Sequence, residues 1–409
     1  MTMRLFPHQQ EARDFLLTKK RCILADAPRV GKTMPTASAA AEHLPALIVC
    51  PAVAKNVWHR AFQAIGIQAT IINGRAAAQG VMANGAVIIN YDLLPDLKAQ
   101  TGWATLVLDE SHRIKNHTAK RTKTALKLMK STERVYCLSG TPIPNRPIEI
   151  WTVLHGLGIY KASWMQFALR YCRAWQSPWG LDVSGAANLP ELKAKMQPYV
   201  LRRKREHVFK DYQHPAISLI ELDLPVDRRE KTFDADALVE NPNLILAIEG
   251  LSEIMREGGI RKVPMALDFI NGRMDQEPEE PIVVFCWHKD VAALLFDGLK
   301  DYKPVMVTGE TPSGKRQQAI DDFQSGKARV MVGNISTLGE GVDLSRSSTV
   351  IFVENTWATS ALEQASARVE NINKAGCAPS IYLLTIRNSL DHVILKKILK
   401  KMDVIDQIL

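Results

Sequence analysis

Short apolar runs alternate with longer polar stretches in two separate parts of the chain. The runs are rich in Val, Ile and Leu and lack the strict alternation of a half-exposed strand, which is typical of strands buried on both faces of a parallel sheet. In the first part the candidate strands are Cys22–Ala25, Ala46–Cys50, Val87–Asn90, Leu106–Leu108 and Val135–Leu138. In the second part they are Ile282–Phe285, Val305–Val307, Val330–Val332, Thr349–Val353 and Ile381–Leu384.

Strand signals fade between residues 151 and 271, where apolar residues recur at the spacing of helices. The acidic, proline-rich segment Asp275–Pro281 follows and is typical of a linker or surface loop. We therefore predict an α/β protein with a first lobe at 1–210, which includes a helical insertion from about residue 151. A helical insertion and linker at 211–280 and a second lobe at 281–389 follow. Residues 390–409 have the pattern of an amphipathic helix.

The chain has 409 residues, enough for two or three domains, and a formal net charge of +9. This balance favours a polyanionic partner, nucleic acid before membrane, although many cytosolic proteins are mildly basic. The basic run Arg202–Arg205 is either a contact to such a partner or a solvated face. The six cysteines show no C-x-x-C spacing, which indicates reduced buried thiols. Without a signal-peptide pattern or an apolar run of about 18 residues, we expect a soluble intracellular protein.

The loop Asp26-Ala-Pro-Arg-Val-Gly-Lys-Thr33 follows the first candidate strand. A Gly-Lys-Thr turn in this position wraps backbone N–H groups around phosphates, and Lys32 reaches the β and γ oxygens of a nucleoside triphosphate. The hydroxyl of Thr33 is suited to Mg²⁺, which needs a carboxylate from a second segment. The other residues of the predicted phosphate site are Arg29, Val30 and Gly31.

The apolar run Leu106–Leu108 ends in two carboxylates, Asp109 and Glu110. A buried strand that ends this way offers one carboxylate to Mg²⁺ and a second one to orient or deprotonate the attacking water. Either segment alone is open to chance. The two in this order, with a spacer that fits several strand–helix units, predict an ATPase that uses ATP and Mg²⁺.

These motifs resemble those of the superfamily 2 helicases, most closely the Swi/Snf-type DNA translocases and, among them, the annealing-helicase branch. The matching segments of the first lobe are Leu5–Gln9, Ile48–Ala52, Asn56–Trp58, Asn90–Tyr91, Asp109–Asn116 and Leu138–Asn145. Those of the second lobe are Val284–Lys289, Ser336–Asp343 and Gln364–Arg368. The resemblance covers nearly the whole chain and implies two RecA-like lobes with helical insertions between them.

The resemblance also implies roles for single residues. Gln9 would read adenine, and His112 would couple the metal site to the hydroxyls of Ser139 and Thr141. The implied nucleotide contacts of the second lobe are Asp343, Gln364 and Arg368. The implied contacts to DNA, mostly to its sugar–phosphate backbone, are Pro51, Lys55, Asn56, Asn90, Trp287 and Thr337.

Two positions depart from the family pattern. Arg29 stands where the phosphate loop usually has a glycine, which lets the backbone adopt a positive φ and approach phosphate. Asn371 stands where an arginine finger usually contributes about 10³–10⁵ in rate. Arg368 would then carry this role alone, or Lys374 or Arg346 would replace the missing group.

Three functions remain open at this point. The first is an ATP-dependent translocase on double-stranded DNA, a monomer by family default, that remodels branched DNA by fork regression, branch migration or strand annealing. The second is a strand-separating DNA or RNA helicase. The third is an ATP-dependent DNA clamp with impaired hydrolysis, for which Arg29 and Asn371 are the evidence. ATP turnover at Lys32, Asp109 and Glu110 separates the third function from the other two.

Overall fold

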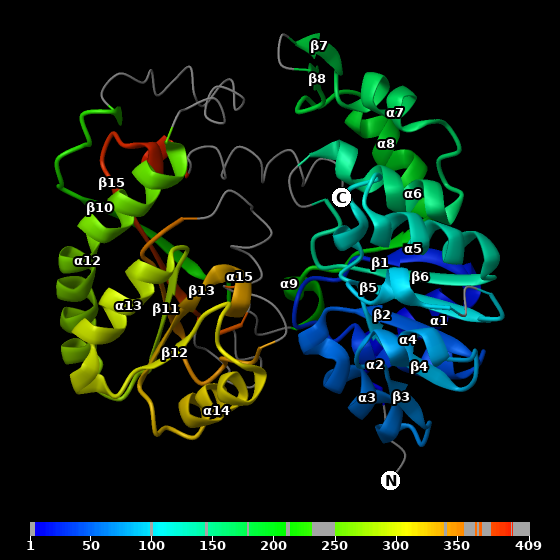
Figure 1. The fold of residues 1–409 in the computed structure, drawn as a ribbon, viewed down its shortest axis with the longest axis horizontal. Coiled ribbons are helices and arrows are strands. Elements are labelled where there is room, and N and C mark those ends of the chain that lie inside the picture. Colours follow the sequence, from blue (N-terminus) through cyan, green and yellow to red (C-terminus); the bar gives the residue numbers. More distant parts are fainter. Residues whose placement is uncertain are drawn as a thin grey trace. The chain divides into compact units, whose positions relative to one another are not determined.

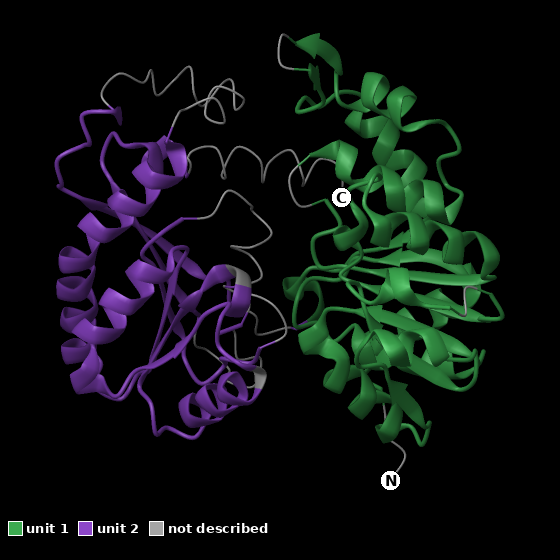
Figure 2. Ribbon diagram, in the orientation of Figure 1, with its two compact units in different colours: residues 1–208, 403–409 green, residues 209–402 purple. Residues whose placement is uncertain are grey.

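The computed structural model describes residues 5–98, 101–143, 146–177, 180–209, 213–230, 250–338, 342–355, 365, 368–369, 378–393 and 395. These residues form two compact units, one up to residue 208 and the other from residue 209 onward (Figure 2). Each unit contains its own parallel sheet with helices packed against it (Figure 1). The predicted α/β class with two parallel-sheet lobes is confirmed.

The first unit is built on a seven-stranded sheet with the order β3-β4-β2-β5-β6-β1-β9, in which all neighbours run parallel. Its strands are β1 (Arg21–Leu24), β2 (Ala46–Cys50), β3 (Ala69–Ile71), β4 (Ala86–Asn90), β5 (Thr105–Asp109), β6 (Arg134–Leu138) and β9 (Val200–Leu201). All five strands predicted for this part of the chain are present. The sequence pattern does not reveal β3 and β9, because runs of two or three residues show no periodicity.

Helices connect these strands and cover both faces of the sheet (Figure 1). They are α1 (Pro7–Lys19), α2 (Thr33–Ala41), α3 (Lys55–Ala64), α4 (Arg75–Gly80), α5 (Lys120–Ser131), α6 (Trp151–Leu157), α7 (Trp164–Tyr171), α8 (Leu189–Met196) and α9 (Arg205–Val208). An antiparallel hairpin of β7 (Trp175–Ser177) and β8 (Gly180–Asp182) lies between α7 and α8 in the chain.

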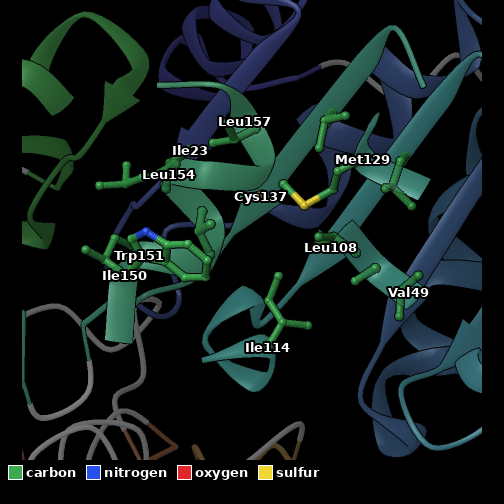
Figure 3. Packing of buried hydrophobic residues seen from close by; sticks show 14 of the residues in the cluster. Ile23, Val49, Leu108, Ile114, Met129, Cys137, Ile150, Trp151, Leu154 and Leu157 are labelled. Carbon is green, nitrogen blue, oxygen red and sulfur yellow. The ribbon is translucent and has the colours of Figure 1, made fainter. Parts of the chain in front are cut away.

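Side chains alternate along β1 between the two faces of the sheet, as the pleat of a strand requires. Cys22 and Leu24 pack in a core with residues of α1, α2 and α3. Ile23 packs on the other face with Leu154 and Leu157 of α6 (Figure 3). The strands are therefore held from both sides, and their carboxyl ends present the loops that carry the candidate chemistry.

The second unit has a six-stranded parallel sheet with the order β10-β15-β14-β11-β13-β12. Its strands are β10 (Ala216–Leu222), β11 (Ile282–Cys286), β12 (Val305–Val307), β13 (Val330–Asn334), β14 (Thr349–Phe352) and β15 (Ser380–Ile386). Its helices are α12 (Leu251–Gln276), α13 (Lys289–Gly298), α14 (Ser313–Gln324) and α15 (Ile335–Leu338). The five strands predicted for this part are all present.

Strand β10 lies in a segment whose pattern predicts helix, so that prediction is wrong for Ala216–Leu222. The strand forms an edge of the sheet and pairs only with β15 among the described strands. Ile217 and Leu219 stay exposed there, so the continuous burial that marks the other strands is missing. Most of the predicted C-terminal helix lies outside the described residues.

Two further sequence-based predictions concern the cysteines and the absence of a membrane-spanning segment. The five cysteines in the described ranges are free and buried, as expected, whereas Cys377 lies outside these ranges. Burial raises the pKa of Cys22 to about 12, so its thiol stays protonated. No helix in the described part of the chain combines the length and the apolar character that crossing a membrane requires.

Candidate active site

The loop between β1 and α2, the predicted phosphate loop, contains two residues with a positive φ. Gly31 adopts a φ of 90°, and Arg29 adopts a φ of 71° although it is not a glycine. The N–H of Val30 donates to the carbonyl oxygen of Ala27 at 3.3 Å, which closes the turn. The departure at Arg29 therefore leaves the turn intact, but it places an arginine in the left-handed region, at a cost of about 1–2 kcal/mol.

The ammonium of Lys32 lies inside this loop. Its Nζ donates to the carbonyl oxygens of Asp26 at 2.7 Å and Ala27 at 3.3 Å. Burial lowers the pKa of Lys32, and the charges of Glu110, Asp26 and Asp109 oppose this change. The lysine therefore shares one electrostatic environment with both carboxylates of the predicted acidic pair.

Helix α1 is attached to the outside of the same loop. The side chain of Gln9 donates from Nε2 to the carbonyl oxygen of Gly31 at 3.3 Å, and its Oε1 accepts from the N–H of Phe6 at 3.1 Å. A Cβ at position 31 would come within 2.7 Å of Gln9 Nε2 and displace this side chain, and the φ of 90° favours glycine independently. His8 Nε2 lies 3.1 Å from the carbonyl oxygen of Val30. Gln9 is thus held at the predicted phosphate loop, and its contact to adenine stays a prediction.

Asp26, the first residue of the predicted motif, is held by an arginine far away in sequence. Arg203 Nε donates to Asp26 Oδ1 at 3.0 Å, Nη2 donates to Oδ2 at 2.5 Å, and the N–H of Arg203 also donates to Oδ1 at 3.0 Å. Arg203 further binds Glu11 of α1 at 2.9 Å. Arg205 Nε donates to the carbonyl oxygen of Pro28 at 2.8 Å. Two members of the basic run Arg202–Arg205 therefore support the phosphate loop rather than form a purely solvated face.

Asp109 ends β5 and is surrounded by hydrogen-bond donors. Trp58 Nε1 donates to Asp109 Oδ2 at 2.8 Å, and the N–H of Glu110 donates to Oδ1 at 3.0 Å. The hydroxyl of Tyr91 donates to the carbonyl oxygen of Asp109 at 2.7 Å. Burial and the charge of Glu110 raise the pKa of Asp109 to about 6, although Trp58 and Lys32 act against this rise. The carboxylate is thus oriented and is costly to ionise until a cation is close to it.

Glu110 is part of a small polar cluster with the segment that follows β6. His112 Nδ1 lies 3.0 Å from Ser139 Oγ and 3.4 Å from Glu110 Oε2. Ser139 Oγ donates to Glu110 Oε2 at 3.4 Å, and the N–H of Thr141 donates to Ser139 Oγ at 3.2 Å. The structure thus joins these four residues in one polar cluster. Glu110 itself adopts a φ of 51°, an unusual backbone conformation of the kind that clusters at functional sites.

The candidate DNA contacts of the first unit differ in how accessible they are. Asn56 is exposed at the start of α3, whereas Pro51 and Asn90 are buried where β2 and β4 end. Lys55 is only 8% exposed, and its Nζ donates to the carbonyl oxygen of Ile72 at 2.7 Å. It also donates to Asn73 Oδ1 at 3.2 Å, and burial lowers its pKa. The predicted role of Lys55 as a DNA contact is corrected: its ammonium is used inside the unit.

In the second unit, Trp287 follows β11 and leaves its ring 46% exposed. Its backbone is fixed, because its N–H donates to Glu354 Oε2 at 2.8 Å and its carbonyl oxygen accepts from Asn334 Nδ2 at 2.7 Å. His288 Nδ1 lies 2.6 Å from Glu354 Oε1. Thr337 lies half-buried in α15. Trp287 is thus presented by a rigid turn, as a contact residue would be.

The candidate nucleotide contacts of the second unit are described only in part. Asp343 is exposed, and its Oδ1 accepts from the N–H of Ser345 at 3.1 Å. The carbonyl oxygen of Arg368 accepts from the N–H of Leu344 at 3.1 Å, which brings the backbones of these two segments together. Gln364 and Asn371 lie outside the described residues.

Four residues lie in segments that the sequence analysis names, but their contacts in the site were not predicted: Asp26, Trp58, Tyr91 and Arg203. One signal was available for Asp26, because a charged residue that directly follows an apolar run needs a partner when the strand is buried. Arg203 is 177 residues away from it, and local periodicity cannot connect the two.

The chain was compared with known proteins. Residues 8–246 match the SNF2-related domain, and residues 261–373 match the helicase conserved C-terminal domain. A Xenopus tropicalis protein named SWI/SNF-related matrix-associated actin-dependent regulator of chromatin subfamily A-like protein 1 is 29% identical over 98% of this chain and 45% of its own length. The mouse DNA annealing helicase and endonuclease ZRANB3 is 26% identical over 95% of this chain and 39% of its own length.

A Caenorhabditis elegans homologue of the Xenopus protein is 29% identical over 99% of this chain and 62% of its own length. The chain thus spans about half the length of the curated relatives that it matches. A solved structure, the Sulfolobus solfataricus SWI2/SNF2 ATPase core in complex with dsDNA, aligns with a TM-score of 0.48 and 19% identity over 100% of this chain and 93% of that one. Because the SNF2-related match covers more than half of the residues, the chain belongs to the SNF2-related family.

Proposed function

We propose that this chain hydrolyses ATP, moves along double-stranded DNA and remodels branched DNA by fork regression, branch migration or strand annealing. One observation carries the proposal: Lys32, Asp109 and Glu110 share one electrostatic environment in a member of the SNF2-related family. The printed names of relatives include a DNA annealing helicase, which supports the choice of annealing and branch remodelling.

Lys32 is the proposed ligand of the γ-phosphate. Its Nζ is held by two backbone carbonyl oxygens, which are weaker partners than a phosphate oxygen. The ammonium can therefore exchange these carbonyls for the γ-phosphate of a bound nucleotide while the loop keeps its conformation. The positive φ of Arg29 and Gly31 shapes the loop in the way that phosphate binding needs. Gln9 sits on the outside of this loop and is proposed to recognise the base.

The hydroxyl of Thr33 and the carboxylate of Asp109 are the proposed Mg²⁺ ligands. A hydroxyl and an oriented carboxylate suit this ion, which keeps several waters and needs only one or two protein ligands. When bound, Mg²⁺ neutralises charge on the β- and γ-phosphates. Trp58 holds Asp109 through Oδ2, and each carboxylate oxygen keeps a free lone pair for the metal.

Glu110 is the proposed base that orients the attacking water. The carboxylate lies within 3.4 Å of both His112 and Ser139, so its position depends on the segment after β6. Movement of that segment would change how Glu110 meets the water. This contact is the proposed route by which the state of the first unit controls hydrolysis.

The proposed DNA contacts are Pro51, Asn56, Asn90, Trp287 and Thr337. A translocase must tolerate every base sequence, so these contacts should go mostly to sugar and phosphate. In the second unit Asp343, Gln364 and Arg368 are the proposed nucleotide contacts, with Arg368 as the cation that acts on the transferred phosphate. We expect a monomer.

Steady-state ATP hydrolysis measured with no nucleic acid, single-stranded DNA, duplex DNA, a fork, a four-way junction and RNA tests this proposal. Stimulation by duplex and branched DNA that disappears in Lys32→Ala supports it. Stimulation mainly by single strands or RNA supports a strand-separating helicase instead. ATP binding without turnover on any of these ligands identifies an ATP-dependent clamp.

A further inference from the structure

A basic pocket of about 620 Å³ opens on the first unit, away from the phosphate loop. It lies where α5 and α6 end and where β1 begins. The strands of this sheet run parallel, so the pocket is at their amino ends, whereas the phosphate loop is at their carboxyl ends. At about 3.3 Å per residue, Arg21 in the pocket and Asp26 in the loop are roughly 15 Å apart along the chain.

All ionisable residues that line the pocket are basic. Lys123, Lys127 and Lys130 lie on one face of α5, and they line the pocket together with the exposed His155 and the half-buried Arg21. None of the three lysines has an ion-pair partner within the described ranges, and all three are exposed. A concave surface whose charged side chains are all cationic attracts anions more strongly than the same charges on a convex surface.

The Arg21 side of the pocket is rigid. The guanidinium of Arg21 donates to four carbonyl oxygens, those of Met129, Thr132, Gly156 and Leu157, at 2.7–3.2 Å. These carbonyls belong to the ends of α5 and α6, so Arg21 satisfies the acceptors that would otherwise repel an anion.

The packing around Arg21 fixes α5 against α6. A Cβ at Gly156 would come within 2.4 Å of the sulfur of Met129, so this close approach requires glycine. Met129 and Leu157 belong to the buried core of this unit (Figure 3). The ring of His155 stacks on Trp151 with centroids 4.7 Å apart, which holds this ring in place. The three lysines therefore project from a helix whose position is fixed by packing.

We propose that this pocket binds the phosphate backbone of a second DNA arm, separate from the duplex along which the motor moves. Lys123 and Lys130 are seven residues apart on α5, which is about 10 Å at 1.5 Å per residue. One DNA strand places a phosphate about every 3.4 Å along its axis, so the row matches roughly three phosphates. The other lining residues, such as Leu126 and Gly158, offer no side-chain donor that would read a base.

This inference rests on the proposed action on branched DNA and gives it a structural basis. A branched substrate has more than one arm, and a second attachment point lets the motor hold one arm while it moves along another. The pocket offers a second attachment point on the same rigid unit as the ATP site. It would raise affinity for junctions above that for a single duplex through the effective concentration of the second arm.

The test is the triple substitution Lys123→Ala, Lys127→Ala and Lys130→Ala in the full chain. Alanine favours helix at these exposed positions, so the fold is retained. Affinities for a four-way junction and for a single duplex are measured without ATP from 50 to 200 mM salt. We expect junction affinity to fall at least tenfold and the slope of its salt dependence to fall by about 2–3, since each phosphate contact contributes about 0.9. Duplex affinity should change less than threefold.

Two controls isolate the pocket from net charge. Replacing the three lysines with arginine keeps the charges and should keep junction affinity within about threefold, since each phosphate contact is mainly electrostatic. Removing three exposed lysines outside the pocket, Lys161, Lys193 and Lys303, lowers the net charge by the same amount and should leave the difference between junction and duplex unchanged. ATP turnover at saturating duplex should stay within about twofold in all variants, because the pocket lies at the opposite end of the strands.

Four results overturn the inference. Unchanged junction affinity in the triple alanine variant removes the second-arm contact and leaves the proposed function standing. An equal loss for junction and duplex places the lysines on the tracked duplex. Tripolyphosphate binding is measured in the same triple alanine variant, and its loss with junction affinity intact makes the pocket a site for a compact anion. If the variant without Lys161, Lys193 and Lys303 loses as much junction affinity as the triple alanine variant, the loss is an effect of net charge. Conversely, a chain that hydrolyses no ATP but still binds junctions through these lysines contradicts only the proposed function.

Discussion

Arg203 holds Asp26 through both oxygens of a carboxylate that is only 1% exposed, and so connects β9 to the start of the phosphate loop. The pair stands 177 residues apart in the chain. A buried carboxylate that loses its partner remains charged in a medium that solvates it poorly. The Arg203–Asp26 ion pair therefore couples the stability of the first unit to the shape of its proposed nucleotide site.

Substituting Arg203→Ala should lower the free energy of unfolding by about 3–5 kcal/mol, because Asp26 would lose its buried partner. ATP binding should weaken in the same variant, since the loop loses the group that holds its first residue. Chemical denaturation and nucleotide titration measure the two effects. Lys204→Ala, at the exposed neighbouring position, is the matched control and should change stability by less than about 0.5 kcal/mol. Equal effects of the two substitutions would contradict the stabilising role of the Arg203–Asp26 ion pair.

The contact between Trp58 and Asp109 should control the Mg²⁺ dependence of turnover. If Asp109 binds Mg²⁺ as proposed, a proton and the ion compete for its carboxylate, whose pKa is raised to about 6. The Mg²⁺ concentration for half-maximal hydrolysis should therefore rise as the pH falls through about 6. Trp58→Phe removes the donor that lowers this pKa, so the rise should begin at a higher pH. Tyr91→Phe removes only a hydrogen bond to the backbone carbonyl oxygen of Asp109. The pH at which the Mg²⁺ requirement rises should therefore stay unchanged in that variant.

The raised pKa of Asp109 also predicts how the stability of the folded chain depends on pH. Asp109 holds its proton more tightly in the folded chain than in the unfolded one, where its pKa has the usual value of 3.8. Its contribution therefore favours folding below pH 4 and declines as the pH rises from about 4 to about 6. A stability profile of Asp109→Asn should lack this decline. A profile identical to that of the parent chain would contradict the assigned shift.

Ser139→Ala should lower the turnover number by about tenfold and leave the Michaelis constant for ATP unchanged, because Ser139 positions Glu110 rather than the nucleotide. Ser111→Ala, in the segment that follows β5 directly after Glu110, is the matched control. Its hydroxyl is buried without a hydrogen-bond partner in the described part of the chain, so its removal should be neutral or slightly stabilising. A higher Michaelis constant with an unchanged turnover number in Ser139→Ala would reject the positioning role.

Position 29 tests the phosphate loop directly. Arg29→Gly should keep ATP turnover and change stability by less than about 1 kcal/mol, because glycine relieves the left-handed backbone while it adds freedom to the unfolded chain. Arg29→Val should destabilise the unit by about 1–2 kcal/mol, since a β-branched residue resists a φ of 71°. Thermal unfolding compares the two variants. Better tolerance of valine than of glycine would show that the positive φ is not required.

The strands and the acidic pair could be predicted because their signals are local. A run such as Ala46–Cys50 is buried at every position, and Asp109 with Glu110 directly follows such a run. Strand β10 could not be predicted, because an edge strand is exposed along much of one side and loses the apolar pattern. Its position in the sheet depends on β15, more than a hundred residues later.

The partners of charged side chains were equally hidden. The sequence shows that Lys55 follows a strand end, as a DNA contact would, but not that the carbonyl oxygen of Ile72 lies within 2.7 Å of its ammonium. The basic run Arg202–Arg205 is similar: its charge is visible in the sequence, whereas its contacts to Asp26 and Pro28 depend on the folded sheet. Residue type predicts what a group is able to do, and tertiary structure selects its partner.

The most direct test of the central claim is the displacement of a third DNA strand from a duplex in the presence of ATP, which detects movement along double-stranded DNA. The chain should displace the strand, and Glu110→Gln should lose at least about 100-fold in rate, since a general base contributes about 10²–10⁴. ATP binding should persist in that variant, because Lys32 and its loop are unchanged. Displacement by Glu110→Gln at the parent rate, or ATP hydrolysis by the parent chain without any displacement, would contradict the account.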